Sequence, residues 1–275
     1  MAEWIQLQDE ESVARILPEG YAKRIRNGDT DTFESRAEGI LLSFSHYDVR
    51  SPQEKPGQII VWITREKVCF LFGRQSDMDM AMQAEPGVSD HEMLCRFFQN
   101  MIQGDMRVQE ALEARIIRAE DDVMRSTTPS VMEKITDFRR SLFAMKKYYE
   151  QLGSILEGLT QNENGFVPRE DQMEFQILSR RVQRLYENVH SLRDYVTQVR
   201  EAYQSQIGIR QNHLMKTFTV VTAIFSPLSL LVGWYGMNLQ MPEFAWKYGY
   251  LFVIGLAILI ISVCYGIFKK HGWLK

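Results

Sequence analysis

The amino-acid sequence predicts an α/β cytosolic domain followed by a long helical stalk and two transmembrane helices. Three observations lead to this prediction. Short β-branched and aromatic runs bounded by turn residues lie in the first 88 residues, a heptad pattern fills residues 175–203, and two uncharged stretches lie near the C-terminus. We therefore expect an α/β domain at 1–88, a helical stalk region at 89–215 that includes the start of a long helix, and a transmembrane region at 216–275.

The α/β domain is expected from three runs that suit strands, at residues 40–46, 58–63 and 68–72. Each is rich in β-branched and aromatic residues and is bounded by turn residues. The short polar sequence Arg65-Glu66-Lys67 between the last two predicts a β-hairpin. A polar segment at residues 75–87 then leads into helix.

Residues 89–159 have a helical pattern. Thr128 and Pro129 are typical of a helix start, because proline is tolerated at the first helical position. Apolar residues then recur at steps of three and four, which predicts one buried helix face. The polar residues 161–165 end this pattern. The apolar stripe consists of Phe138, Leu142, Met145, Tyr149, Leu152 and Leu156.

A much longer helix is expected to begin at Pro168. Its apolar residues alternate steps of three and four, which is a heptad seam that needs a partner helix. The first proline inside this stretch is Pro227, so the helix is expected to continue to about Met237. Its length would then be about 100 Å at 1.5 Å per residue. Few monomeric folds bury such a rod, so the pattern indicates an oligomer. The seam consists of Phe175, Leu178, Val182, Leu185, Val189, Leu192, Val196, Val199 and Tyr203.

The two uncharged stretches are residues 217–242 and 248–268, separated by a loop that contains Glu243 and Lys247. Each is longer than the roughly 20 residues that a helix needs to cross a bilayer, and we place the spans at about 217–237 and 248–268. Lysine and arginine flank the spans rather than the loop, so both termini are predicted to be cytoplasmic, in a bacterial-type inner membrane. The flanking cations are Arg210, Lys216, Lys269, Lys270 and Lys275.

Charge and motifs exclude other classes of function. Residues 1–216 carry 28 Lys and Arg against 34 Asp and Glu, which argues against a nucleic-acid partner. The sequence has no glycine-rich phosphate loop, no Gly-x-Ser-x-Gly and no His-Glu-x-x-His. Its five histidines are scattered, whereas metal sites need clustered ligands. We therefore do not expect an enzyme or a resident cofactor.

The first span carries one face of small and hydroxyl-bearing residues, which we call the polar stripe. Membrane helices pack through small and hydroxylated residues, so close packing is one interpretation. A water-lined path is the other. The stripe, with two bulky residues at its cytoplasmic end, consists of Asn212, Met215, Phe218, Thr222, Ser226, Ser229 and Gly233.

The turn after this span reads Tyr235-Gly236-Met237-Asn238 and continues to Met241-Pro242-Glu243. Together with the two C-terminal spans and the lysine-rich end, this sequence resembles the family of CorA-type divalent metal-ion transporters. The likeness is strong over residues 203–275, where the Asn, Met-Lys and Pro of that family match Asn212, Met215-Lys216 and Pro227. The remaining chain agrees in the order of its elements.

This resemblance implies a funnel-shaped homopentamer in which five long helices line one pore. By position, Tyr235, Gly236, Met237 and Asn238 would form the outer selectivity loop, and the polar stripe would face the pore. Met215 and Phe218 would form an apolar gate, with Lys269 and Lys270 as a basic collar. Phe218 replaces a smaller aliphatic residue of the family, and Ser226 replaces a bulkier apolar one.

The transported ion is expected to be Mg²⁺ or Zn²⁺, with Co²⁺ and Ni²⁺ as further candidates. Amide and hydroxyl oxygens suit a hard, hydrated ion such as Mg²⁺, but the ZntB-like zinc branch of the family has a similar pore signature. In the Mg²⁺ branch, carboxylates between subunits bind a regulatory ion. Asp194 matches one such position, and Asp77 and Asp79 are candidates for its partner.

The sequence therefore predicts transport of divalent metal cations across the cytoplasmic membrane. A membrane-anchored coiled-coil sensor or scaffold without transport activity is the alternative. The polar stripe and the Tyr235–Asn238 turn favour transport, because a plain anchor needs neither.

Overall fold

The computed structural model describes residues 3–27, 30, 32–51, 54–81, 89–125, 128–237 and 246–273. It divides into two compact units, Met1–Ala202 and Tyr203–Lys275, which we call the first and second units. The α/β region and most of the helical region lie together in the first unit. The three-part division at residues 88 and 215 stays a prediction about domain boundaries.

Within the described residues of the first unit, five strands form one sheet in the order β1-β5-β4-β3-β2. β1 pairs with β5 in parallel, and the other neighbours are antiparallel. The three predicted strands are present, and the predicted hairpin is closed by Thr64, whose N–H donates to the Lys67 carbonyl at 3.0 Å. Two short edge strands add to them. The strands are β1 (Glu3–Gln6), β2 (Phe33–Arg36), β3 (Gly39–His46), β4 (Gly57–Ile63) and β5 (Val68–Phe72).

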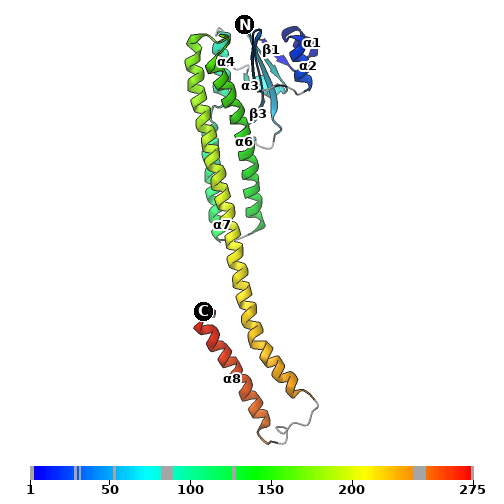
Figure 1. Ribbon diagram of the computed structural model, residues 1–275, viewed down its shortest axis with the longest axis vertical. Helices are drawn as coiled ribbons and strands as arrows, with labels where there is room; N and C mark the ends of the chain where they lie inside the picture. Colours follow the sequence, from blue (N-terminus) through cyan, green and yellow to red (C-terminus); the bar gives the residue numbers. More distant parts are fainter. Residues whose placement is uncertain are drawn as a thin grey trace. The chain divides into compact units, whose positions relative to one another are not determined.

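Helices cover both faces of the sheet (Figure 1). On one face, α1 (Glu10–Ile16) and α2 (Glu19–Asn27) bury Leu17 and Tyr21 against Leu41, Ile60 and Trp62. The opposite face packs on α4 (Asp90–Met101) through phenylalanine pairs, with Phe70 and Phe97 ring centroids 5.0 Å apart. The central strands β3, β4 and β5 are buried on both sides for this reason, so their sequences are mostly apolar rather than alternating.

The polar segment after β5 contains a helix, α3 (Gln75–Ala81), where the sequence predicts only a polar lead-in. One of its polar side chains, Asp77, is buried and accepts hydrogen bonds from both Arg74 and His46. Gly57 makes room for this cluster, since a Cβ at that position would collide with the Asp77 carboxylate.

Three further helices follow: α5 (Asp105–Arg125), α6 (Pro129–Gln161) and α7 (Arg169–Tyr235). Thr128 is the N-cap of α6 and Pro129 its first residue, as predicted. Asn162 ends α6 in the left-handed conformation, with φ of 46°, and its side-chain amide both donates to the Val167 carbonyl and accepts from the Val167 N–H.

The heptad seam of α7 finds its partners within the same chain, which corrects one step of the sequence argument. Every seam residue from Phe175 to Val199 is buried, and α7 is bonded to α5 by side chains such as Tyr195, whose hydroxyl donates to Glu120. α5, α6 and the N-terminal half of α7 lie side by side in Figure 1. The seam alone therefore does not require an oligomer.

The second unit contains the rest of α7 and α8 (Gly249–Lys270). Both helices are long and apolar enough to cross a membrane, and the apolar window of α8 has none of its residues buried. At 1.5 Å per residue, the 22 residues of α8 reach ~33 Å. The predicted spans are thus present as helices that the chain itself leaves largely uncovered.

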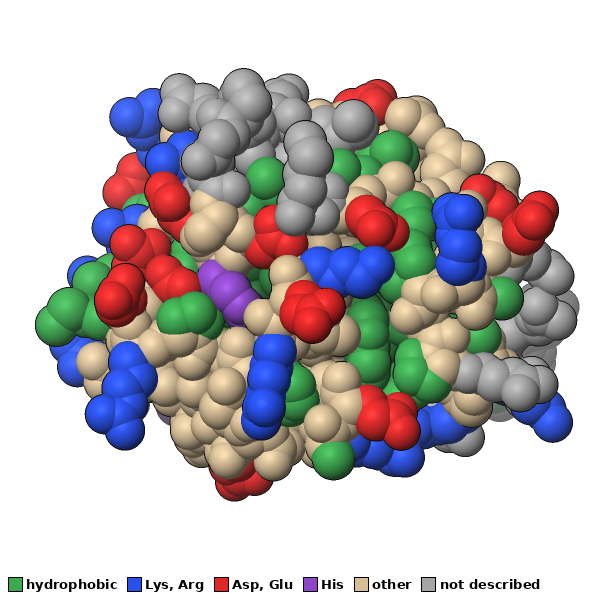
Figure 2. All heavy atoms as spheres, turned by 90° about the horizontal axis from the view of Figure 1, so that it is seen from above, with side chains coloured by type: hydrophobic (Ala, Val, Ile, Leu, Met, Phe, Trp, Pro, Cys, Tyr) green, Lys and Arg blue, Asp and Glu red, His purple; other side chains and the backbone are tan. Residues whose placement is uncertain are grey.

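The outer surface of the first unit carries both signs of charge. On the face seen in Figure 2, acidic and basic side chains of the described residues are interspersed rather than gathered into blocks. Such mixing is usual for a solvated surface.

Candidate ion pathway

The polar stripe of α7 is exposed along its whole length. Asn212, Thr222, Ser226, Ser229 and Gly233 are all exposed, and so are the bulkier Met215 and Phe218, at 63% and 65%. Within the described residues of the second unit, nothing covers this face. The stripe is therefore free to face water, lipid or another copy of the chain.

The opposite side of the same helix is the side that is partly covered. Its less exposed residues lie, at about 100° per residue, on a face turned away from the stripe. Exposed apolar side chains, including Val221, Phe225 and Val232, lie between the two faces. The helix thus has one covered face, one polar face and apolar flanks. The less exposed residues are Val220, Ala223, Ile224, Pro227, Leu228, Leu231 and Tyr235.

One contact on the covered face joins the Cys264 thiol to a backbone carbonyl that Pro227 leaves without its usual donor. Proline has no N–H, so Pro227 cannot donate to the carbonyl of Ala223 four residues earlier. The Cys264 thiol of α8 donates to that carbonyl at 3.8 Å, which is a normal length for sulfur. A backbone acceptor freed by proline inside a membrane helix is thereby given another donor, as such helices require.

Phe218 of the predicted gate and Lys269 of the predicted basic collar lie at about the same level along the pair of helices α7 and α8. The two helices run antiparallel (Figure 1), so the contact between Cys264 and Ala223 puts Lys269 near the level of Phe218. Lys269 and Lys270 form the last turn of α8, where cations are favoured by the helix dipole. Gly272 follows the end of the helix in the left-handed conformation, with φ of 69°, and the Trp273 N–H donates to the Phe268 carbonyl.

The predicted outer mouth is described in part. α7 ends at Tyr235, and the Gly236 N–H still donates to the Val232 carbonyl at 2.9 Å. Met237 follows, with its N–H donating to the Trp234 carbonyl at 3.3 Å. Asn238 and Glu243 lie outside the described residues. The structure therefore brings the stripe up to the predicted selectivity loop.

Comparison with known proteins identifies the family. The model of the CorA-like Mg²⁺ transporter protein family matches residues 23–270, which is most of the chain. The chain belongs to the CorA-like family.

Individual relatives agree with this membership. The cobalt/magnesium transport protein CorA of Thermotoga maritima is 29% identical over 168 residues, which cover 60% of this chain and 47% of that protein. The magnesium transport protein CorA of Mannheimia succiniciproducens is 41% identical over 96 residues, covering 34% of this chain and 30% of the relative. The chain thus aligns with a third to a half of the length of these curated relatives.

The structural match covers more of the chain than the sequence matches do. The complete structure of the CorA magnesium transporter from Methanocaldococcus jannaschii has a TM-score of 0.78 and 18% identity, and the match covers 98% of this chain and 91% of that one. The α/β domain, stalk and C-terminal helices therefore follow the CorA fold, as the sequence predicts.

The carboxylates predicted to bind a regulatory ion are not gathered within one CorA-like chain. Asp194 is exposed on α7 with His190 at 3.4 Å. Burial alone would raise the pKa of Asp77, but the hydrogen bonds from His46 and Arg74 outweigh it and hold the pKa below its ordinary value. Asp79 accepts a hydrogen bond from Gln75 at 2.8 Å. Among the described residues, no three His, Cys, Asp or Glu side chains gather around a possible metal position.

Sequence reasoning missed a buried polar cluster on α5, in the first unit of this CorA-like chain. Asp105 and Gln109 are buried on α5 at positions of its apolar face, followed by Leu112 and Ile116. Two polar residues that replace apolar ones in such a stripe are a signal that can be seen in the sequence. The partners of these residues, on α6 and α7, depend on tertiary packing and cannot be read from that spacing.

Proposed function

We propose that this protein transports divalent metal cations across the cytoplasmic membrane through a homopentameric pore lined by α7. The observation that carries this proposal is the exposed polar stripe, which lies opposite the face that α8 partly covers. A lipid-facing helix has no use for a row of hydroxyl groups such as Thr222, Ser226 and Ser229. Membership of the CorA-like family supports the same function.

The chemistry of the stripe suits a hydrated ion. Mg²⁺ gives up its water reluctantly and prefers oxygen ligands. Side chains such as Thr222, Ser226 and Asn212 can accept hydrogen bonds from the water shell of the ion without replacing it. The membrane potential supplies the driving force, because two charges moving inward gain about 4.6 kcal/mol per 100 mV. Mg²⁺ or Zn²⁺ is the proposed ion, and Co²⁺ and Ni²⁺ are further substrates to test.

Assembly into a pentamer would depend on the second unit. The seam of α7 is already buried within the first unit, whereas the apolar flanks of the stripe are exposed. Packing flank to flank would place five stripes around one axis and leave α8 outside, facing lipid. Both termini would then be cytoplasmic, with the Tyr235–Asn238 loop at the opposite mouth.

Within this pore, Met215 and Phe218 would form the gate, Lys269 and Lys270 the basic collar, and Gly236 and Asn238 the selectivity loop. Stacked apolar rings can stop ions by losing their water. Glu243 would lie beside the mouth. Asp194, which is exposed on α7, is proposed to bind a regulatory ion only together with carboxylates of a neighbouring subunit.

The test is ion uptake into proteoliposomes, with Mg²⁺, Zn²⁺, Co²⁺ and Ni²⁺ compared. Ser229→Leu should block uptake because it fills the stripe, whereas Ser262→Leu is a matched control at an exposed position of α8, outside the proposed pore. A native mass of five chains is expected for the wild type and both variants. Undiminished uptake by an assembled Ser229→Leu protein, or a dominant monomer or dimer, would overturn the proposed pore.

A further inference from the structure

A buried polar chain begins at a cavity of about 600 Å³ in the first unit. The cavity is bounded by the end of β3, the loop that follows it, α3 and the turn between α4 and α5. Asp105, the first residue of α5, reaches into it although the residue is only 3% exposed. One of its carboxylate oxygens accepts a hydrogen bond from the Tyr149 hydroxyl of α6 at 2.9 Å.

The chain continues from α5 to α7 through Gln109, one turn beyond Asp105. Gln109 is completely buried. Its side-chain amide donates to the Leu185 carbonyl at 3.2 Å and accepts from the Asn188 side chain at 2.7 Å. Leu185 and Asn188 both belong to α7, which carries the polar stripe further along. One face of α5 therefore connects the cavity to the helix proposed to line the pore.

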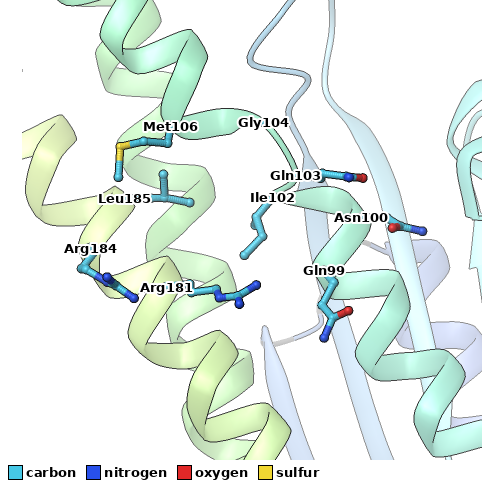
Figure 3. Close-up of a pocket in the computed structure, with 9 residues that line it drawn as sticks. All are labelled: Gln99, Asn100, Ile102, Gln103, Gly104, Met106, Arg181, Arg184 and Leu185. Carbon is cyan, nitrogen blue, oxygen red and sulfur yellow. The ribbon is translucent and has the colours of Figure 1, made fainter.

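The turn between α4 and α5 gives a second connection. The Arg50 guanidinium donates to the Gln103 carbonyl of this turn at 2.8 Å, and Gly104 follows with φ of 85°. The other side of the turn borders a second pocket of about 480 Å³, where Ile102 and Gly104 face Arg181 and Arg184 of α7 (Figure 3). A shift of this turn changes the surface that α7 meets.

Charged and titratable groups face Asp105 from every side of the cavity. β3 supplies His46, the following loop supplies Asp48 and Arg50, and α6 supplies Tyr149 beside Tyr148. From α3, Asp77 accepts hydrogen bonds from His46 and Arg74, and Glu54 lines the cavity 3.6 Å from the Arg74 guanidinium. Asp105 thus lies between cations that favour its charge and a carboxylate, Asp48, that opposes it.

Burial raises the pKa of Asp105 to about 6, although the hydrogen bond from Tyr149 and the charges of Arg50 and His46 lower it in part. With that value the carboxyl is about 90% ionised at pH 7 and about 10% at pH 5. Burial also raises the pKa of Tyr149, so its hydroxyl keeps its proton and remains a donor over this range.

We propose that Asp105 and its cavity form a proton-binding regulatory site, which α7 senses through Gln109 and the turn between α4 and α5. When Asp105 is ionised, its charge attracts Arg50 and strengthens the hydrogen bond from Tyr149. Proton binding removes that charge, weakens both interactions and adds an O–H donor. The first turn of α5 then changes its position between α6 and α7. The effect on transport rests on the proposed function.

The experiment measures Mg²⁺ uptake by the reconstituted full chain while the pH at the cytosolic face is varied from about 5 to about 7. The wild-type rate should change about fivefold or more over this range, with a midpoint near pH 6. Asp105→Asn should keep uptake but lose most of that pH dependence. The matched control is Asp137→Asn, an exposed carboxylate on α6, which should behave as wild type.

Two variants separate a regulatory role from a structural one. Tyr149→Phe removes a hydrogen bond that lowers the pKa of Asp105, so the midpoint should move to higher pH. Gln109→Leu cuts the connection to α7, so thermal stability should still titrate near pH 6 while uptake no longer follows. If Asp105→Asn transports normally and retains the wild-type pH profile, the regulatory site is wrong although transport stands. Absence of uptake by the wild type at every pH would instead defeat the proposed function, and the thermal titration in Gln109→Leu and Tyr149→Phe would then decide whether Asp105 binds the proton.

Discussion

The two parts of α7 lie in opposite environments although they form one continuous helix. From Phe175 to Val199 its seam residues are buried against helices of the same chain, whereas from Asn212 to Met237 most side chains are exposed. The first part is complete within one chain. The second part has apolar flanks and a polar stripe that the described residues of the chain leave exposed. One helix therefore combines a segment buried in the fold of the chain with a segment whose surroundings lie outside it.

The largest expected effect contrasts a leucine from each part. Leu192→Ala removes a side chain that is 3% exposed and should lower the free energy of unfolding by about 2–5 kcal/mol. Leu230→Ala removes one that is 72% exposed and should change it by less than about 0.5 kcal/mol. Urea unfolding of the detergent-solubilised protein, followed by far-UV circular dichroism, makes the measurement. Equal losses would mean that the second part is packed as tightly as the first, either within one chain or between copies of it.

A second prediction concerns the mouth at the end of the exposed part. Asn238→Gly keeps the freedom of the turn, because both residues tolerate left-handed backbone conformations, but it deletes the amide. Uptake should fall by at least about tenfold if five amides orient the water shell of the ion. The pentamer should persist in native mass measurements. Wild-type uptake by the assembled variant would leave Asn238 as a turn residue only.

The gate tests the cytoplasmic end of the same stripe. Replacing Met215 and Phe218 together with Ser makes both proposed rings wettable, so leak flux should rise several-fold, about three- to tenfold. Both side chains are exposed in the single chain, and assembly should therefore survive. Flux that does not change would place the constriction elsewhere along α7.

The smallest expected effect belongs to the buried part. The pKa of Asp105 is about 6 in the folded chain, above its ordinary value, so wild-type stability is fullest below about pH 4 and declines as the pH rises through 6. Asp105→Asn has no charge to bury and should be more stable than wild type at pH 7 by about 1 kcal/mol. Thermal unfolding at pH 5 and pH 7 measures the difference. An equal effect at both pH values would contradict the raised pKa.

The buried and exposed parts also differ in how far the sequence predicts them. The periodicity of Phe175 to Val199 identifies a buried face, but it does not say whose helix buries it, and the structure assigns that partner to the same chain. Hydropathy locates both spans because lipid imposes length and composition directly. The edge strands β1 and β2 have only four residues each and depend on pairing with β5 and β3, so local sequence predicts them poorly.

The candidate pathway follows the same rule. The stripe from Asn212 to Gly233 can be predicted, because residues on one face of a helix are fixed by spacing alone. The cluster of His46, Arg74 and Asp77 brings together a strand, a turn and a helix, and the chain that links Asp105 to Asn188 joins three helices. Such contacts are set by tertiary packing, and only the polar positions on the apolar face of α5 announce them.

The missing backbone hydrogen bond at Pro227 has a mechanical consequence for the long helix. A regular helix resists bending because each turn is fastened to the next by three or four such bonds, and prolines are where helices usually kink. At the level of Ala223 one of these fastenings is replaced by the thiol of Cys264, which is a weak donor. We therefore expect the segment from Pro227 to Met237 to tilt more easily than the preceding part of the helix. The hydrogen bond from Cys264 to Ala223 ties α7 to α8 just before this segment.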